Sequence, residues 1–82
     1  MVKQYAMFTF PQDRVREPII YTLSQQYSVV TNIRRADISV DSGWVVLELE
    51  GEESDIEQGI SWVTSKGVRV DPVSDSILES FE

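Results

Sequence analysis

The sequence predicts a small α+β sandwich, in which two helices cover one face of a four-stranded antiparallel sheet. The order strand, helix, strand occurs twice within 82 residues. Apolar side chains alternate with the two-residue period of a strand in the outer segments and recur at helical spacing between them. Right-handed crossovers of two such units place the second and fourth strands at the edges of the sheet.

The first strand is predicted over residues 2–10, which are rich in β-branched and aromatic side chains. With a period of two, Phe8 and Phe10 fall on one face of this strand, whereas Tyr5 and Met7 fall on the other. The strand is therefore expected to cover the core with one face and to leave two large side chains on the opposite face.

The middle of the chain predicts a helix, a strand and a hairpin. Pro18 suits the first turn of a helix, so the first helix is expected to start near Glu17. A long second strand is expected over residues 29–40. Asp41-Ser42-Gly43 is a hairpin signal, and residues 44–50 alternate as a third strand.

The second helix follows an acidic segment that complements the positive end of a helix dipole. Ser54 and Glu57 have the spacing of a capping box, and Gly67 is the expected residue just beyond the helix. Residues 68–73 are expected to form the last strand. Residues 74–82 are expected either to form a short helix that packs back or to fray.

These elements together make a ferredoxin-like βαββαβ sandwich, expected as a single domain over residues 1–82 with a core over about residues 2–73. The apolar positions on the helix-facing side are expected to be buried. They are Phe8, Phe10, Ile19, Leu23, Ile33, Val45, Leu47, Leu49, Ile56, Ile60, Val63, Val68 and Val70.

Composition limits the chemistry of the chain. There is no Cys and no His, which removes disulfides, thiolate sites and the commonest general base. We therefore expect no catalytic residue, no metal and no cofactor. Residues 1–36 carry five basic and two acidic side chains, whereas residues 37–82 carry two basic and twelve acidic ones. The net charge of −7 argues against nucleic-acid binding. Without a signal peptide or an apolar run of about 20 residues, a cytoplasmic protein with no membrane insertion is expected.

Several short motifs, in their order and spacing, resemble one family over about residues 5–73. They are Glu17-Pro18-Ile19-Ile20, Asn32-Ile33, Gly43-Trp44-Val45-Val46-Leu47-Glu48-Leu49, Ile60-Ser61-Trp62-Val63 and Gly67-Val68-Arg69-Val70. Together they resemble the NIL domain, a relative of the ACT-like regulatory domains.

The resemblance implies a regulatory domain that forms a dimer and binds methionine. NIL domains are typically appended to the ATPase subunit of methionine importers or to ferredoxin-like proteins. This sequence contains no Gly-x-x-x-x-Gly-Lys-Ser/Thr loop and no Cys cluster, so a freestanding NIL domain is expected. The triplet Asn-Ile-Leu that names the family reads Asn32-Ile33-Arg34 here. A cation thus replaces an apolar side chain, which leaves specificity for methionine open.

The sheet face without helices is the candidate interface, with Tyr5, Met7, Trp44 and Val46 expected on it. Two aromatic rings, a Met and a Val on a solvent-facing sheet suggest a cover, either a second subunit, a ligand or the tail of the chain. Scattered apolar side chains on an ordinary surface are the alternative.

Asn32 and Arg34 are the candidate ligand-binding residues. The resemblance implicates Asn32 in amino-acid binding near a dimer interface, and an amide both donates to a carboxylate and accepts from an ammonium group. Arg34 and Arg35 are adjacent on a strand and are expected to point to opposite faces. A guanidinium suits a carboxylate or phosphate, whereas protection of a sheet edge from aggregation is the alternative.

The sequence thus predicts a small regulatory or ligand-sensing module that acts without catalysis. It is expected to bind an amino acid or similar small anionic metabolite at or near a homodimer interface. The alternative is a protein–protein interaction adaptor with no small ligand. Such an adaptor would use the basic first half and the acidic second half for docking to a regulated partner.

Overall fold

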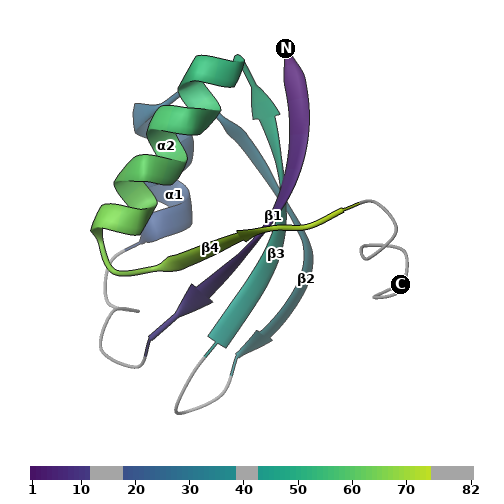
Figure 1. Ribbon diagram of the computed structural model, residues 1–82, viewed down its shortest axis with the longest axis vertical. Helices are drawn as coiled ribbons and strands as arrows, with labels where there is room; N and C mark the ends of the chain where they lie inside the picture. Colours follow the sequence, from purple (N-terminus) through teal and green to yellow (C-terminus); the bar gives the residue numbers. More distant parts are fainter. Residues whose placement is uncertain (12–17, 39–42, 75–82) are drawn as a thin grey trace.

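A computed structural model describes residues 1–11, 18–38 and 43–74. Within them, the chain forms β1 (Val2–Phe10), α1 (Ile19–Gln26), β2 (Val30–Ile38), β3 (Gly43–Gly51), α2 (Glu53–Ser65) and β4 (Arg69–Pro72). The strands make one sheet in the order β2-β3-β1-β4, and both helices lie on one face of it (Figure 1). The predicted fold class and the predicted edge positions of β2 and β4 are confirmed.

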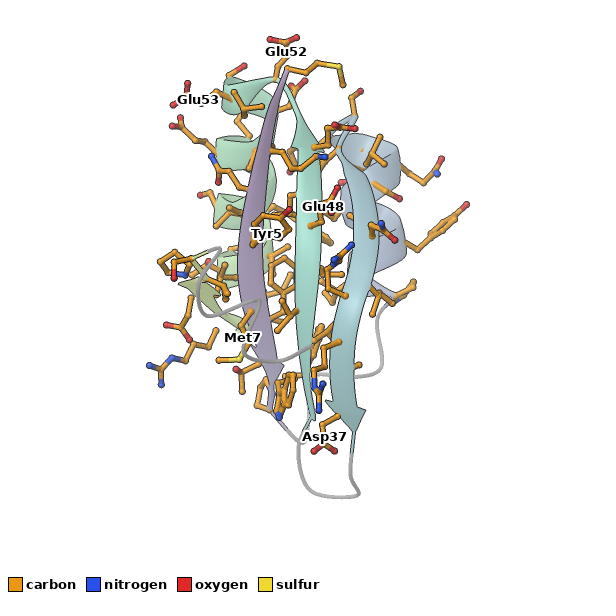
Figure 2. All side chains as sticks on the ribbon, turned by 90° about the vertical axis from the view of Figure 1, so that its right-hand side faces the viewer. Tyr5, Met7, Asp37, Glu48, Glu52 and Glu53 are labelled. Carbon is orange, nitrogen blue, oxygen red and sulfur yellow. The ribbon has the colours of Figure 1, made fainter. Side chains whose placement is uncertain are left out.

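The two central strands, β1 and β3, pair antiparallel along their whole length, with Ala6 opposite Leu47 and Phe8 opposite Val45. These side chains are buried on the helix side of the sheet. Since successive residues of a strand point to opposite faces, the residues between them lie on the other side. We call this side, which faces the viewer in Figure 2, the open face.

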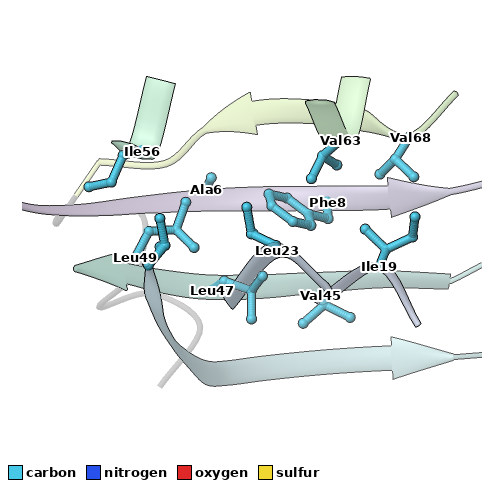
Figure 3. Packing of buried hydrophobic residues seen from close by; sticks show 11 residues of the cluster. Ala6, Phe8, Ile19, Leu23, Val45, Leu47, Leu49, Ile56, Val63 and Val68 are labelled. Carbon is cyan, nitrogen blue, oxygen red and sulfur yellow. The ribbon is translucent and has the colours of Figure 1, made fainter. Parts of the chain in front are cut away.

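The core lies between the sheet and the two helices (Figure 3). Burying one such apolar side chain contributes about 1.5–3 kcal/mol, so this cluster supplies the main stabilising free energy. Phe10, Ile60 and Val70 are half-buried against it. The predicted core residues that are fully buried are Phe8, Ile19, Leu23, Val45, Leu47, Leu49, Ile56, Val63 and Val68, and Ala6 and Val29 join them.

The prediction that Ile33 is buried is wrong, because its side chain is 59% exposed. Ile33 pairs with Leu47 and therefore belongs to the helix side of the sheet. It lies on an edge strand, however, and the eight-residue helix α1 leaves it uncovered. The period of a strand predicts the face of a side chain, but not whether another element covers it.

The two helices approach each other closely at Gly59 of α2. A Cβ atom at this position would meet the Leu23 side chain and lie 3.6 Å from Cβ of Tyr27, both on or next to α1. The rings of Tyr27 and Trp62 lie nearby, with their centroids 6.0 Å apart. The absence of a side chain at Gly59 therefore allows α1 and α2 to pack side by side.

The helix ends follow the prediction only in part. Gly67 follows α2 with φ at 89°, a conformation that favours glycine, so its predicted role is confirmed. The predicted capping box is wrong, since Glu52 is the N-cap residue of α2 and makes no side-chain cap hydrogen bond. The first helix begins at Ile19, and Glu17 lies outside the described residues. The predicted hairpin before β3 and the tail beyond residue 74 also lie outside them.

Candidate functional site

The open face carries the four residues predicted from the sequence as a candidate interface. Tyr5 and Met7 lie on β1, where Met7 pairs with Val46 of β3, and Trp44 is two residues away on the same strand. Tyr5, Met7 and Trp44 are half-buried, whereas Val46 is 0% exposed although it does not belong to the helix-side core. The open face therefore includes one side chain, that of Val46, which solvent does not reach.

The edge strand β2 contains a β-bulge at Arg34. Ile33 pairs with Leu47, but the next pair along the ladder joins Arg35 to Val46. Arg34 is therefore an additional residue in β2, and the side chains after it change face. Because Val46 lies on the open face, its partner Arg35 lies on that face too.

The Arg34 side chain reaches Glu48, which also lies on the open face (Figure 2). The expectation that Arg34 and Arg35 point to opposite faces is therefore wrong. A bulge sets two residues against one, which a strict period of two does not allow. The sequence alone did not predict the bulge, and it therefore did not predict that Arg34 and Arg35 both lie on the open face.

Glu48 lies between two cations from neighbouring strands. Nζ of Lys3 on β1 is 3.4 Å from Oε1, and Nη1 of Arg34 on β2 is 3.8 Å from Oε2. Tyr5 and Asn32 are the two cross-strand partners of Glu48. The Glu48 side chain is only 16% exposed, so its charge is less screened than in an ordinary surface ion pair. We call Lys3, Tyr5, Asn32, Arg34 and Glu48 the Glu48 cluster.

Lys3 belongs to this cluster, although the sequence reasoning did not select it. Its hydrogen bond to Glu48, and then the charge of that carboxylate, raise the pKa of Lys3 above its ordinary value of 10.5. Lys3 shares the period-two face of Tyr5 and Met7, and this signal was available in the sequence. Its partner, Glu48, could not be read from the sequence, because pairing across strands depends on the register.

The structure brings Asn32 and Arg34 together on one strand beside Glu48. Asn32 is exposed, and its side chain supplies both hydrogen-bond donors and an acceptor. The Glu48 cluster therefore offers an amide, a phenol, a carboxylate and two cations within three neighbouring strands. Such a set recognises small charged molecules through ion pairs and hydrogen bonds.

The most exposed large apolar residues away from the N-terminus lie near the edge strand β2, among the described residues. Val30 and Ile33 of β2 are 57% and 59% exposed, and Tyr21 of α1 is 66% exposed. The predicted interface residues on the open face are more buried than these. An apolar partner would therefore gain more contact area at the β2 edge than over the centre of the open face.

Two further properties concern metals and membranes. Within residues 1–11, 18–38 and 43–74, no three acidic side chains gather closely enough to hold a metal ion. In the same part of the chain, neither helix has the length and apolar character needed to cross a membrane.

Three comparisons place the chain among known proteins. The family model of the NIL domain matches residues 5–72. The methionine import ATP-binding protein MetN 1 of Enterococcus faecalis is 31% identical over 79 residues, which cover 92% of this chain and 21% of that protein. The crystal structure of the C-terminal domain of an ABC transporter/ATP-binding protein from Enterococcus faecalis has a TM-score of 0.79 at 22% identity. It matches 88% of this chain and 84% of that chain.

The fold and the comparisons define a small α+β module of regulatory type. The chain belongs to the NIL domain family, and the resemblance inferred from its motifs is confirmed. It spans about a fifth of the length of the curated relative that it matches.

Proposed function

We propose that this NIL domain senses an amino acid or a similar small anionic metabolite at the Glu48 cluster, without catalysis. The observation that carries the proposal is the ion pair of Arg34 with the largely buried Glu48, whose cross-strand partner on β2 is Asn32. On the pattern of the methionine importer relative, the regulated partner is an ATP-binding subunit of a transporter. We place this action in the cytoplasm, where such subunits meet ATP.

The contacts support a polar ligand of this size. The Arg34 guanidinium is a permanent cation that suits a ligand carboxylate, and the Asn32 amide donates to the same group. Both side chains come from β2, so the strand fixes their spacing. Partial burial of Glu48 keeps the local charges from being fully screened, which strengthens contacts made there.

We further propose that the domain forms a homodimer through the edge of β2. Val30 and Ile33 are exposed large apolar residues on this strand, and a strand edge pairs readily with a second strand. The ladder to β3 is regular over residues 30–33 and again over residues 35–38, with the bulge at Arg34 between them. We propose that a second copy pairs with the part of β2 before the bulge, where Val30 and Ile33 are exposed, which sets Asn32 and Arg34 at the subunit boundary.

Ligand binding at a subunit boundary regulates by linkage. A ligand that binds the dimer more tightly than the monomer shifts the population toward the dimer by its difference in binding free energy. The assembled state then differs from the free state in the surface that it presents to a partner. Regulation in this form requires no chemical step.

Calorimetry with the full chain tests the ligand, using the amino acids and common anionic metabolites as probes. Asn32→Ala and Arg34→Ala are expected to weaken binding. The control is Arg69→Ala, because Arg69 lies on β4 and pairs with Asp71 at 3.0 Å. A ligand at 100 times its Kd is expected to add about 2.7 kcal/mol of stability. Absence of binding below about 1 mM, or equal binding by all variants, would contradict the proposal.

Sedimentation velocity tests the dimer. The wild-type chain is expected to sediment above its monomer mass of 9.4 kDa at micromolar concentration, and Ile33→Asp is expected to return it to that mass. Ser61→Asp is the control, because it adds the same charge at an exposed position of α2. A wild-type chain that sediments only as a monomer would rule out the β2 interface.

The alternative is an adaptor that binds a protein partner and no small molecule. The exposure of Tyr21, Val30 and Ile33 favours it, because these residues offer apolar surface to a protein partner. The same ligand scan separates the two functions. An adaptor shows no stabilisation with any metabolite, whereas a sensor responds to its ligand.

A further inference from the structure

The apolar part of the open face is centred on Val46. Its cross-strand partners are Met7 on β1 and Arg35 on β2, and Trp44 lies on the same side of β3. Val46 is 0% exposed and Met7 and Trp44 are half-buried, although both helices lie on the other side of the sheet (Figure 1). We call Met7, Trp44 and Val46 the open-face patch. Because burial of apolar surface is favourable, a cover over this patch would stabilise the fold.

The open-face patch is too small to hold a second protein by itself. A stable protein–protein interface takes roughly 20–30 residues from each side, whereas this patch is bordered by charged residues such as Arg35 and Asp71. A separate chain also loses translational and rotational freedom when it binds, and a few apolar contacts do not offset that cost. A segment of the same chain is tethered, which gives it an effective concentration on the order of millimolar.

The chain leaves the sheet close to this patch. After β4 ends at Pro72, the backbone N–H of Val73 donates to the carbonyl oxygen of Tyr5, at 3.0 Å. Tyr5 is two residues from Met7 on β1, which corresponds to about 7 Å along the strand. The residues that follow, 75–82, therefore start near the border of the patch. We call residues 75–82 the tail segment.

The tail segment is long enough to cross the sheet. Four strands at a spacing of about 4.8 Å measure about 14 Å from the first strand to the last. Eight residues reach about 12 Å as a helix and about 26 Å when extended. In either form, the segment reaches from β4 over β1 to β3, where Trp44 and Val46 lie.

The sequence of the tail segment complements the open face. Its apolar residues, Ile77, Leu78 and Phe81, have the spacing of one side of a helical turn. Its residues at positions 75, 79 and 82 are acidic, and Arg34 and Arg35 lie beside Val46 on the open face. The segment follows residues 5–72, which the NIL family model matches, so this pattern belongs to the chain and not to the family model.

We propose that the tail segment packs across the open face, with its apolar side chains against the open-face patch and its acidic side chains toward Arg34 and Arg35. The contact is autoinhibitory, because a protein partner that uses the patch has to displace the segment first. It is separate from the Glu48 cluster, which contains none of the three patch residues. The inference therefore goes beyond ligand sensing and stands or falls independently of it.

Nuclear Overhauser spectroscopy on the full chain tests the contact directly. Cross-peaks are expected from the Phe81 ring and the Leu78 methyl groups to the Met7 methyl group and the Trp44 ring. They are expected to persist on dilution, because both partners belong to one molecule. Phe81→Asp is expected to abolish them, since a charge in place of the ring does not pack on an apolar patch.

Acrylamide quenching of Trp44 measures the same contact from the side of the solvent. The full chain carries Trp62→Phe, so that Trp44 is its remaining tryptophan. Phe81→Asp in this parent chain is expected to raise the quenching constant of Trp44, because the cover is lost. Ser76→Asp is the matched control, since it adds the same charge on the side of the helical turn opposite to Phe81. Its quenching constant is expected to equal that of the parent chain.

Two results would overturn the proposal. The first is the absence of the cross-peaks, or equal quenching of Trp44 in Phe81→Asp and Ser76→Asp. The second is protection of Trp44 that disappears on dilution, which would identify a second copy as the cover. Because the cross-peaks are measured in the unsubstituted chain, they decide the matter even if a variant folds poorly.

Discussion

Leu47 and Ile33 lie opposite each other on neighbouring strands, but their side chains contribute differently to the free energy of unfolding because they are buried to different extents. Leu47 is 0% exposed within the core, whereas Ile33 is 59% exposed at the edge of the sheet. Substitution by Ala removes three apolar carbon atoms from either side chain. The two variants therefore measure the effect of burial at nearly constant chemistry.

The expected magnitudes follow from the two exposures. At about 0.8 kcal/mol per buried carbon, Leu47→Ala loses about 2.4 kcal/mol of transfer free energy. The cavity that it leaves increases the total loss to about 3–5 kcal/mol. With about 40% of its side chain shielded, Ile33→Ala is expected to lose only about 1 kcal/mol. A domain of this size has roughly 4–12 kcal/mol in all, so the first loss threatens folding and the second does not.

Urea unfolding, followed by the fluorescence of Trp44 and Trp62, measures both losses. The variants are compared at a protein concentration where the chain sediments as a monomer, so that subunit contacts do not enter. Equal losses in the two variants would refute the edge position of Ile33. A loss in Ile33→Ala that grows with protein concentration is expected from the proposed β2 interface.

Three further outcomes are expected. Gly59→Ala should cost up to about 2 kcal/mol net in thermal unfolding, because its new Cβ meets the Leu23 side chain and overpacking of about 1–3 kcal/mol outweighs about 1 kcal/mol gained in helix propensity; a more stable variant would contradict the close packing of the helices. An NMR titration should find the pKa of Lys3 above 10.5 and nearer 10.5 in Glu48→Gln. Since the folded value is raised, this ion pair stabilises the fold below the ordinary pKa, and its contribution disappears as the pH rises through the folded value; an unchanged pKa in Glu48→Gln would contradict the pair. Val46→Ala should cost about 1.6 kcal/mol although it lies on the open face, and a loss below about 0.5 kcal/mol would identify it as an ordinary surface residue.

Most of the fold was predictable because its signals are local. The alternation along Gly43–Gly51 and the glycine after α2 each depend on a few neighbouring residues. The face assignments on β1 and β3 were sufficient to locate the core. Ile33 was misassigned because burial at an edge depends on the length of α1, and nothing in the strand itself reports that length.

The Glu48 cluster was only partly predictable. Asn32 and Arg34 were predicted from the motif, but Lys3 joins them through the register of β1 against β3. The sequence of one strand does not determine which residues of the neighbouring strand lie opposite it. The bulge was not visible either. Arg34 occupies it without a glycine, the residue that most often marks such a position.

The bulge connects the unusual triplet of this chain with both proposed roles of β2. Before it, Val30 and Ile33 lie on a regular ladder that a second copy can extend. At the bulge the regular ladder is interrupted, and it resumes at Arg35. The interruption also directs Arg34 and Arg35 to the face that carries Glu48.

An apolar residue in place of Arg34 would leave Glu48 with Lys3 as its remaining cation among the ion pairs described above. The change from the family triplet therefore adds a positive charge beside the proposed ligand site and leaves Val30 and Ile33 unchanged, so that it alters the proposed specificity and not the proposed β2 interface.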